Sequence, residues 1–243
     1  MFGFHRKRGR RSSKTSLLVG VFACSLATGV PSGVHAGSTV NQDAGLWFPV
    51  TVTFPISSAF LGFMEVQPRF EDNVSELGQL ILRPAIGYKL TDHLSIWQGY
   101  AWIGDYQPTF IEENRVFQQV TYKRAFPSIR LQSRTRLEER IIDQADGTAV
   151  RFRTLLRGDF PLPNATAWAI VMFDEIFVNL NTVGHGPNAG FNQNRFFLGV
   201  NHQLTQHLNM DLGYQMQAVN GGQSGLINDI SHIIFLQMAI NLP

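Results

Sequence analysis

The chain has 243 residues, with 20 Lys+Arg against 18 Asp+Glu. Six of the basic residues and none of the acidic ones fall in the first 36 residues, which leaves 14 against 18 in the remainder. The basicity therefore belongs to the N-terminal stretch and excludes charge as an argument for nucleic-acid binding. The single cysteine, Cys24, lies in the same stretch, so the remainder can form no disulfide and no thiolate metal site.

The first 36 residues have the anatomy of a cleaved signal peptide. Basic residues precede an apolar run from Ser16 to Val30, and Val34-His35-Ala36 has the small-x-small pattern of a signal peptidase site. We expect general secretion with cleavage after Ala36; Arg10-Arg11 leaves a twin-arginine signal open, and Val21 to Cys24 leaves a lipoprotein signal open. The expected domains are a signal peptide (residues 1–36) and a β-barrel (residues 37–243).

Beyond residue 36, the chain has no apolar run of the roughly 18 residues that a spanning helix needs. Entry into a membrane would therefore require strands, whose backbone groups must close into a barrel because lipid offers them no hydrogen-bond partners. Eleven segments are expected to be strands: 44–54, 60–70, 77–90, 94–104, 115–122, 128–142, 148–160, 165–181, 190–204, 208–219 and 229–242.

The count of eleven conflicts with the even number of strands usual in single-chain bacterial barrels. Either a short strand is missed or the weakest segment, Arg115 to Tyr122, is not a strand. We expect 10 to 12 strands and prefer 12. Asp105 to Asn114 is interpreted as a long acidic outer loop, and the short turns, such as Thr91 to His93, are placed on the periplasmic side.

Segment 128–142 has the clearest pattern. Arginines, glutamine and glutamate at even positions alternate with Ile129, Leu131, Leu137 and other largely apolar residues at odd positions. A helix would mix the two sets, so the pattern indicates a strand with one charged and one apolar face. In segment 165–181, Asp174 falls on the apolar stripe, which predicts either a β-bulge or a position at the membrane boundary.

Alternation alone does not say which face is outside, and a lipocalin-like barrel would put the polar face in water. Three features favour lipid outside. Only Lys89 and Lys123 follow the N-terminal stretch, aromatic residues often lie near the ends of the apolar stripes, and the strands outnumber the eight of a lipocalin. The predicted fold class is all-β: an antiparallel up-and-down transmembrane β-barrel in the bacterial outer membrane.

The segments as a set resemble an uncharacterised family of bacterial outer-membrane barrels, known only as a domain of unknown function. The resemblance is carried by Arg83 to Gly104, Asn114 to Val120, Arg134 to Arg140, Phe173 to Phe177 and Phe191 to Gln217. It implies architecture and location but no activity. The chain departs from such proteins at its end, Asn241-Leu242-Pro243, where an aromatic residue that assists assembly generally stands.

The charged faces define the candidate site. The residues expected to line the lumen are Glu65, Arg69, Arg83, Arg130, Arg134, Arg136, Glu138, Arg140, Arg151, Arg153, Arg157, Glu175, Arg195 and Asp211. The arginines among them could attract anions through a narrow pore. Alternatively, the arginines could pair with Glu65, Glu138, Asp159, Glu175 and Asp211 and form a salt-bridged plug. The plug is preferred because side chains fill much of so small a barrel.

Signals for enzymatic activity are poor. The Gly-x-Ser-x-Gly and His-Glu-x-x-His motifs and phosphate-binding glycine loops are absent. A lipid-hydrolase site could be built from His202, His207, Asp211 and Ser95, and a metal site from His93, His202 and His207, but nothing in the sequence makes either set converge. No catalytic residue, metal or cofactor is expected.

The leading hypothesis is thus a non-enzymatic outer-membrane barrel, acting as a narrow pore or a structural component. The alternatives are a surface enzyme that modifies lipid or lipopolysaccharide, and a periplasmic ligand-binding barrel. Expected partners are outer-membrane lipid and lipopolysaccharide, the barrel-assembly machinery and small anionic solutes, with no nucleic acid.

Overall fold

The computed structural model describes residues 40–221 and 227–243. The expected signal peptide and its cleavage site lie outside these residues. All regular structure in the described part is β, and none of it contains a helix long and apolar enough to cross a membrane. The strands are β1 Asn41–Trp47, β2 Val50–Pro55, β3 Phe60–Glu71, β4 Glu76–Lys89, β5 Leu94–Asp105, β6 Ile111–Phe126, β7 Ile129–Ile142, β8 Thr148–Leu162, β9 Ala165–Asn179, β10 Gly190–Gln203, β11 Leu208–Asn220 and β12 Ile227–Asn241.

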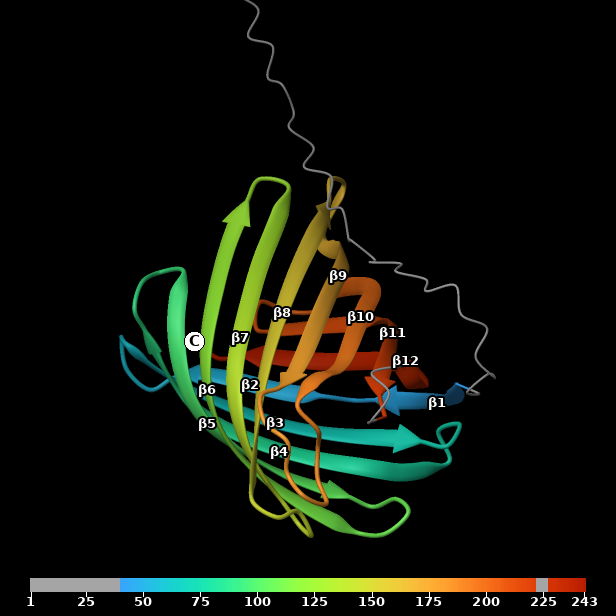
Figure 1. Cartoon of the computed structure of the whole chain (residues 1–243). Helices are drawn as coiled ribbons and strands as arrows, with labels where there is room; N and C mark the ends of the chain where they lie inside the picture. Colours follow the sequence, from blue (N-terminus) through green and yellow to red (C-terminus); the bar gives the residue numbers. More distant parts are fainter. Residues whose placement is uncertain (1–39, 222–226) are drawn as a thin grey trace, which may run out of the picture. The chain divides into compact units, whose positions relative to one another are not determined.

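The strands form one closed, mostly antiparallel sheet in which neighbours in sequence are neighbours in space. β12 returns to β1 and β2 and closes the barrel (Figure 1). β1 and β2 occupy a single position, because both pair with β12 on one side and with β3 on the other. The predicted all-β barrel is confirmed, with twelve strands at eleven positions.

The odd number of positions explains the one departure from antiparallel order. In an up-and-down sheet successive strands reverse direction, so the first and the eleventh positions run the same way. β12 must therefore pair in parallel with both β1 and β2. As a result Asn41 lies at the opposite end of the barrel from Asn241.

The twelfth strand arises from a break inside the first expected segment, 44–54. Pro49 separates β1 from β2 and has no N–H to give to the ladder. Its carbonyl still accepts a hydrogen bond from Met238, at 2.9 Å, and Phe48 donates to Pro68, at 3.0 Å, so the two halves stay aligned.

The doubt that segment 115–122 forms a strand was wrong, because the segment lies within β6. β6 is the longest strand at 16 residues and begins at Ile111. The predicted acidic loop Asp105 to Asn114 is accordingly reduced to residues 106–110, and Glu112 and Glu113 belong to the strand. Acidic residues followed by arginine resemble a solvated loop, but here they continue the period-two pattern of the strand.

The two ends of the barrel differ. Connections of two to four residues (56–59, 90–93, 127–128, 163–164 and 204–207) define what we call the turn end. Residues 72–75, 106–110, 143–147, 180–189 and 221 define the loop end.

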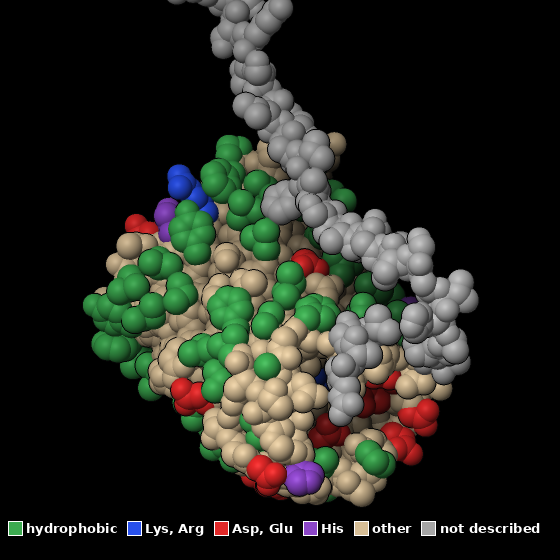
Figure 2. Space-filling model, viewed as in Figure 1, with side chains coloured by type: hydrophobic (Ala, Val, Ile, Leu, Met, Phe, Trp, Pro, Cys, Tyr) green, Lys and Arg blue, Asp and Glu red, His purple; other side chains and the backbone are tan. Residues whose placement is uncertain are grey.

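The outer face of the wall is apolar. Its most exposed side chains include Ile86 at 58%, Ile234 at 57% and Met64 at 51%. In the face shown in Figure 2, hydrophobic side chains cover much of the wall, and most of the visible charged side chains lie near its margins. Asp174 belongs to this outer face without any bulge at its position, and it accepts a hydrogen bond from Asn194 at 2.9 Å.

Part of the interior is aromatic. Phe197 is fully buried and stacks on Phe173 with ring centroids 4.7 Å apart, while Phe235 approaches it edge-on at 5.3 Å. The ring of Phe197 lies over Gly199 and Gly213, where added Cβ atoms would come within 2.5 and 2.8 Å of it. The glycines therefore provide the space in which this cluster packs.

Candidate functional site

The structure places the predicted lumen residues on the inner face of β3, β4 and β7–β11. The buried members are Glu65, Arg69, Arg83, Arg136, Glu138, Arg151, Arg153, Glu175, Arg195 and Asp211. Arg134, Arg140 and Arg157 are partly exposed, and Arg130 is the most exposed, with 43% of its side chain accessible. Their period-two spacing puts one face of each strand inside the barrel.

Glu138 is the centre of one buried ion-pair group. It accepts from Arg151 at 2.6 Å, from Arg153 at 3.1 Å and from Arg136 at 3.4 Å. Arg136 and Arg153 are direct partners across β7 and β8 and would repel each other. The carboxylate of Glu138 lies between these like charges and compensates both.

Glu113 performs the same role one strand earlier. Arg115 and Arg140 oppose each other across β6 and β7, and Glu113 pairs with both, at 2.6 Å to Arg140. Sequence reasoning missed Glu113 and Arg115 as lumen residues, because Glu113 was assigned to a loop and Arg115 to a doubtful strand. The signal was the alternation Glu113, Arg115, Phe117, Gln119.

Glu175, on β9, extends the network to a third strand. It pairs with Arg153 at 2.8 Å, Arg134 at 2.9 Å and Arg195 at 4.0 Å. Arg153 thus bridges Glu138 and Glu175, and the two groups form one continuous network from β7 to β10.

The remaining predicted acids also pair with arginine. Glu65 accepts from Arg83, while Asp211 and Asp159 both pair with Arg157, with Asp159 at 2.7 Å. The prediction of buried arginine–carboxylate salt bridges is therefore confirmed.

Aromatic faces stabilise arginines that the carboxylates do not fully neutralise. The guanidinium of Arg69 lies 3.7 Å from the ring centroid of Trp47, and that of Arg136 lies 4.0 Å from Phe117. Arg195 lies over Trp47 as well, at 4.7 Å. Such cation–π contacts are worth about 0.5–2 kcal/mol each. These rings were not predicted from the sequence as partners of the arginines, although the rings and the arginines both lie on the inner face of the strands.

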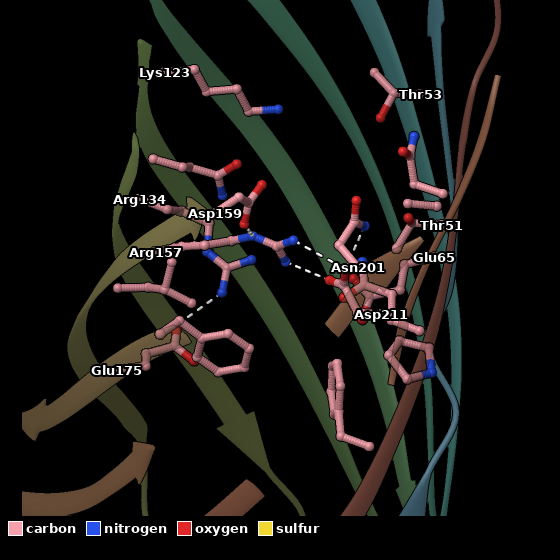
Figure 3. A pocket seen from close by; sticks show the side chains of 18 of the residues that line it. Thr51, Thr53, Glu65, Lys123, Arg134, Arg157, Asp159, Glu175, Asn201 and Asp211 are labelled. Atoms are coloured by element: carbon pink, nitrogen blue, oxygen red, sulfur yellow. Dashed lines mark hydrogen bonds and ion pairs between the residues drawn. The ribbon is translucent and has the colours of Figure 1, made fainter. Parts of the chain in front are cut away.

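A cavity of about 520 Å³ reaches into the barrel (Figure 3). Its lining includes strand ends at the turn end, among them Lys123, Arg130 and Asn241, and none of the described residues of the loop-end connections. In Figure 3, Lys123, Arg134 and Arg157 project from one side toward Thr51, Thr53 and Glu65 on the other. The cavity ends in the interior among members of the ion-pair network.

The residues considered for catalysis have separate local partners. Asp211 is engaged by Arg157 and by Asn201, at 2.7 Å, and Ser95 accepts from Trp97 at 2.9 Å. His202 stacks on Trp168 with centroids 4.0 Å apart. Its Nδ1 lies 3.3 Å from the carbonyl of Ala167.

The histidines considered for a metal site are likewise spread over local contacts. Nδ1 of His207 lies 2.9 Å from the carbonyl oxygen of Asn241, and His93 packs edge-on against Tyr122. Within residues 40–221 and 227–243, no three or more His, Cys, Asp or Glu side chains gather as a metal site would need.

Fold and interior together define a class of protein: a closed β-barrel with an apolar outer wall and an interior of buried arginine–glutamate salt bridges. The chain belongs to the family described as protein of unknown function (DUF2490), whose model matches residues 44–225. It is also similar to an uncharacterised protein of Methylorubrum extorquens, 33% identical over 226 residues that cover 89% of this chain and 94% of the relative. The resemblance to a barrel family of unknown function is thus confirmed.

Proposed function

We propose that this protein is a non-enzymatic outer-membrane barrel whose lumen is closed by its own ion-pair network, and that it serves as a structural or ligand-holding barrel rather than as an open pore. Short turns would face the periplasm and the loop end the cell exterior, as is usual for such barrels.

The apolar outer wall supports the membrane location. Large apolar side chains such as Met64, Ile86 and Ile234 are more than half exposed, and similar residues recur along most strands. Soluble monomers rarely expose contiguous apolar surface beyond a few hundred Å². Lipid would cover such a wall, and the signal-peptide pattern of residues 1–36 supplies a route of export.

The single observation that supports a closed lumen most directly is that Arg153 pairs with two glutamates. It joins Glu138 to Glu175, so buried ion pairs run without interruption across the inner faces of four strands. The aromatic cluster of Phe173, Phe197 and Phe235 fills the interior beside this network. Ions would have to displace paired, desolvated charges to pass.

Planar-bilayer recording of the refolded protein tests this proposal. We expect no steady conductance from the wild type, and intermittent openings when Glu138→Ala and Glu175→Ala are combined. The matched control is Glu139→Gln, because Glu139 neighbours Glu138 but lies exposed on the outer face. A stable, anion-selective wild-type current that Arg134→Ala plus Arg153→Ala abolishes would replace the closed barrel with a pore.

Cell fractionation tests the location. The protein should sediment with the outer membrane and change its gel mobility on heating in detergent. Recovery in the soluble periplasmic fraction would contradict the membrane assignment.

A further inference from the structure

The turn-end cavity carries an excess of positive charge. Nine basic residues line it against four acidic ones, namely Glu65, Asp159, Glu175 and Asp211. All four acids are already paired with arginines. Asp159 is shared between Arg157 and Arg130, so the four acids leave cations in the cavity without a carboxylate of their own.

Lys123 is the clearest case. It lines the cavity, and its ammonium group makes no hydrogen bond or ion pair with the described residues; Figure 3 shows this group projecting inward. Arg157 and Arg134 repel it, and Asp159, which already pairs with Arg157, attracts it. Arg130 adds a fourth charge and reaches only Asp159, at 3.6 Å.

The guanidinium of Arg134 has N–H donors that are not used within the described chain. One terminal nitrogen of its guanidinium binds Glu175 at 2.9 Å, whereas its Nε has no partner within the described chain. Arg134 also lines a second cavity, of about 260 Å³, together with Lys123, Gln132, Thr53 and Phe63, which line both. Because the two cavities share this wall, we treat them as one vestibule.

The vestibule also contains Lys89, on the wall of the second cavity. Lys89 and Lys123 are the only lysines in residues 40–243, so both lysines of the barrel stand at this one site. Lysine ammonium groups act as point charges for phosphate, and arginine adds a planar fork that holds two oxygens.

From this arrangement we propose that the vestibule binds a small organic phosphate, whose dianionic phosphoryl group lies between Lys123, Arg134 and Arg130. Phe63, which lines both cavities, contacts its organic part. The volume suits such a ligand, because small-molecule pockets span about 300–1,000 Å³. The inference rests on the closed barrel proposed above, since an open lumen would let the ligand pass.

Isothermal titration of the folded protein in zwitterionic detergent, with glycerol 3-phosphate as the probe, tests the site. We expect saturable binding that Lys123→Gln weakens at least tenfold and Lys123→Arg retains. Lys123→Gln removes a cation that has no paired carboxylate, so it should leave the denaturation midpoint unchanged or raise it. Loss of binding with unaltered folding therefore separates a binding role from a structural one.

A second arm uses lysophosphatidate in the same detergent and distinguishes a lipid from a soluble source of the phosphate. Tighter binding of lysophosphatidate assigns the organic part to a lipid, and tighter binding of glycerol phosphate assigns it to a soluble metabolite. Equal binding of lactate, a monoanion, or no binding by any phosphate would overturn the proposal. Steady conductance in bilayers would instead overturn the closed barrel, so the two failures are distinguishable.

Discussion

Replacing Glu138 by glutamine should destabilise the barrel strongly. The side chain is 1% exposed and accepts from Arg136, Arg151 and Arg153. Without its charge, Arg136 would lose its carboxylate partner while facing Arg153 across β7 and β8, and Arg153 would keep only Glu175. Removing one partner of a buried ion pair costs roughly 3–5 kcal/mol because the remaining charge stays desolvated. This corresponds to a fall of roughly 140- to 4,000-fold in the folding equilibrium constant.

Urea unfolding in lipid vesicles, followed by tryptophan fluorescence, measures this free energy. Glu139→Gln is the control, because it alters the next residue on the exposed outer face and should change the free energy of unfolding by less than about 0.5 kcal/mol. Equal stability of Glu138→Gln and wild type would refute the reasoning, since it would mean that the arginines are compensated by something other than this carboxylate.

Three further outcomes are expected. Gly99→Val should cost about 1–3 kcal/mol in unfolding free energy, because a Cβ would lie 2.1 Å from the ring of Phe117. Adding Phe117→Ala should restore part of the lost stability, and a single variant as stable as the wild type would contradict the packing. Ile234→Arg should cost about 2–4 kcal/mol in vesicles, because Ile234 lies mid-strand on the outer face, whereas a water-facing wall would tolerate it. In intact cells an impermeant maleimide should label Asn41→Cys but not Asn241→Cys, because eleven strand positions put these residues at opposite ends; equal labelling would contradict the parallel closure.

The strands were largely predictable because each one repeats the same contrast between a polar and an apolar face. The eleven expected segments correspond to the eleven positions around the barrel. The division of the first segment was missed, although Pro49 within it was a warning that the ladder would be interrupted.

The parallel closure was not predicted, because the even count of known bacterial barrels favoured adding or removing a strand. Whether the last strand pairs in parallel or antiparallel with the first depends on which strands meet when the barrel closes. The residues of these strands carry no local signal for it. Only the pairing of β12 with both β1 and β2 reveals it.

The charged part of the site could be predicted as a face but not as a network. Alternation put Arg136, Glu138, Arg151 and Arg153 inside, while the register across β7 and β8 decides that Glu138 lies between two opposed arginines. The register of neighbouring strands depends on turn geometry and closure, which a single strand does not encode.

The aromatic interior was missed for a different reason. Phe173, Phe197 and Phe235 are apolar residues on faces that otherwise carry polar residues, and their packing requires distant glycines such as Gly199 and Gly213. Glycine in a strand marks a close approach without identifying which ring will fill it.

The most direct test of the central claim, a wall with lipid outside and a polar interior, is spin-label accessibility at two positions in a Cys24→Ser background. Leu198→Cys lies on the outer face, where Leu198 is 48% exposed, and Gln132→Cys lines the vestibule. In lipid vesicles, a nitroxide at position 198 should collide with oxygen far more than with a water-soluble nickel chelate, and one at position 132 should show the reverse. Preferential nickel collisions at position 198 together with oxygen collisions at position 132 would contradict the account.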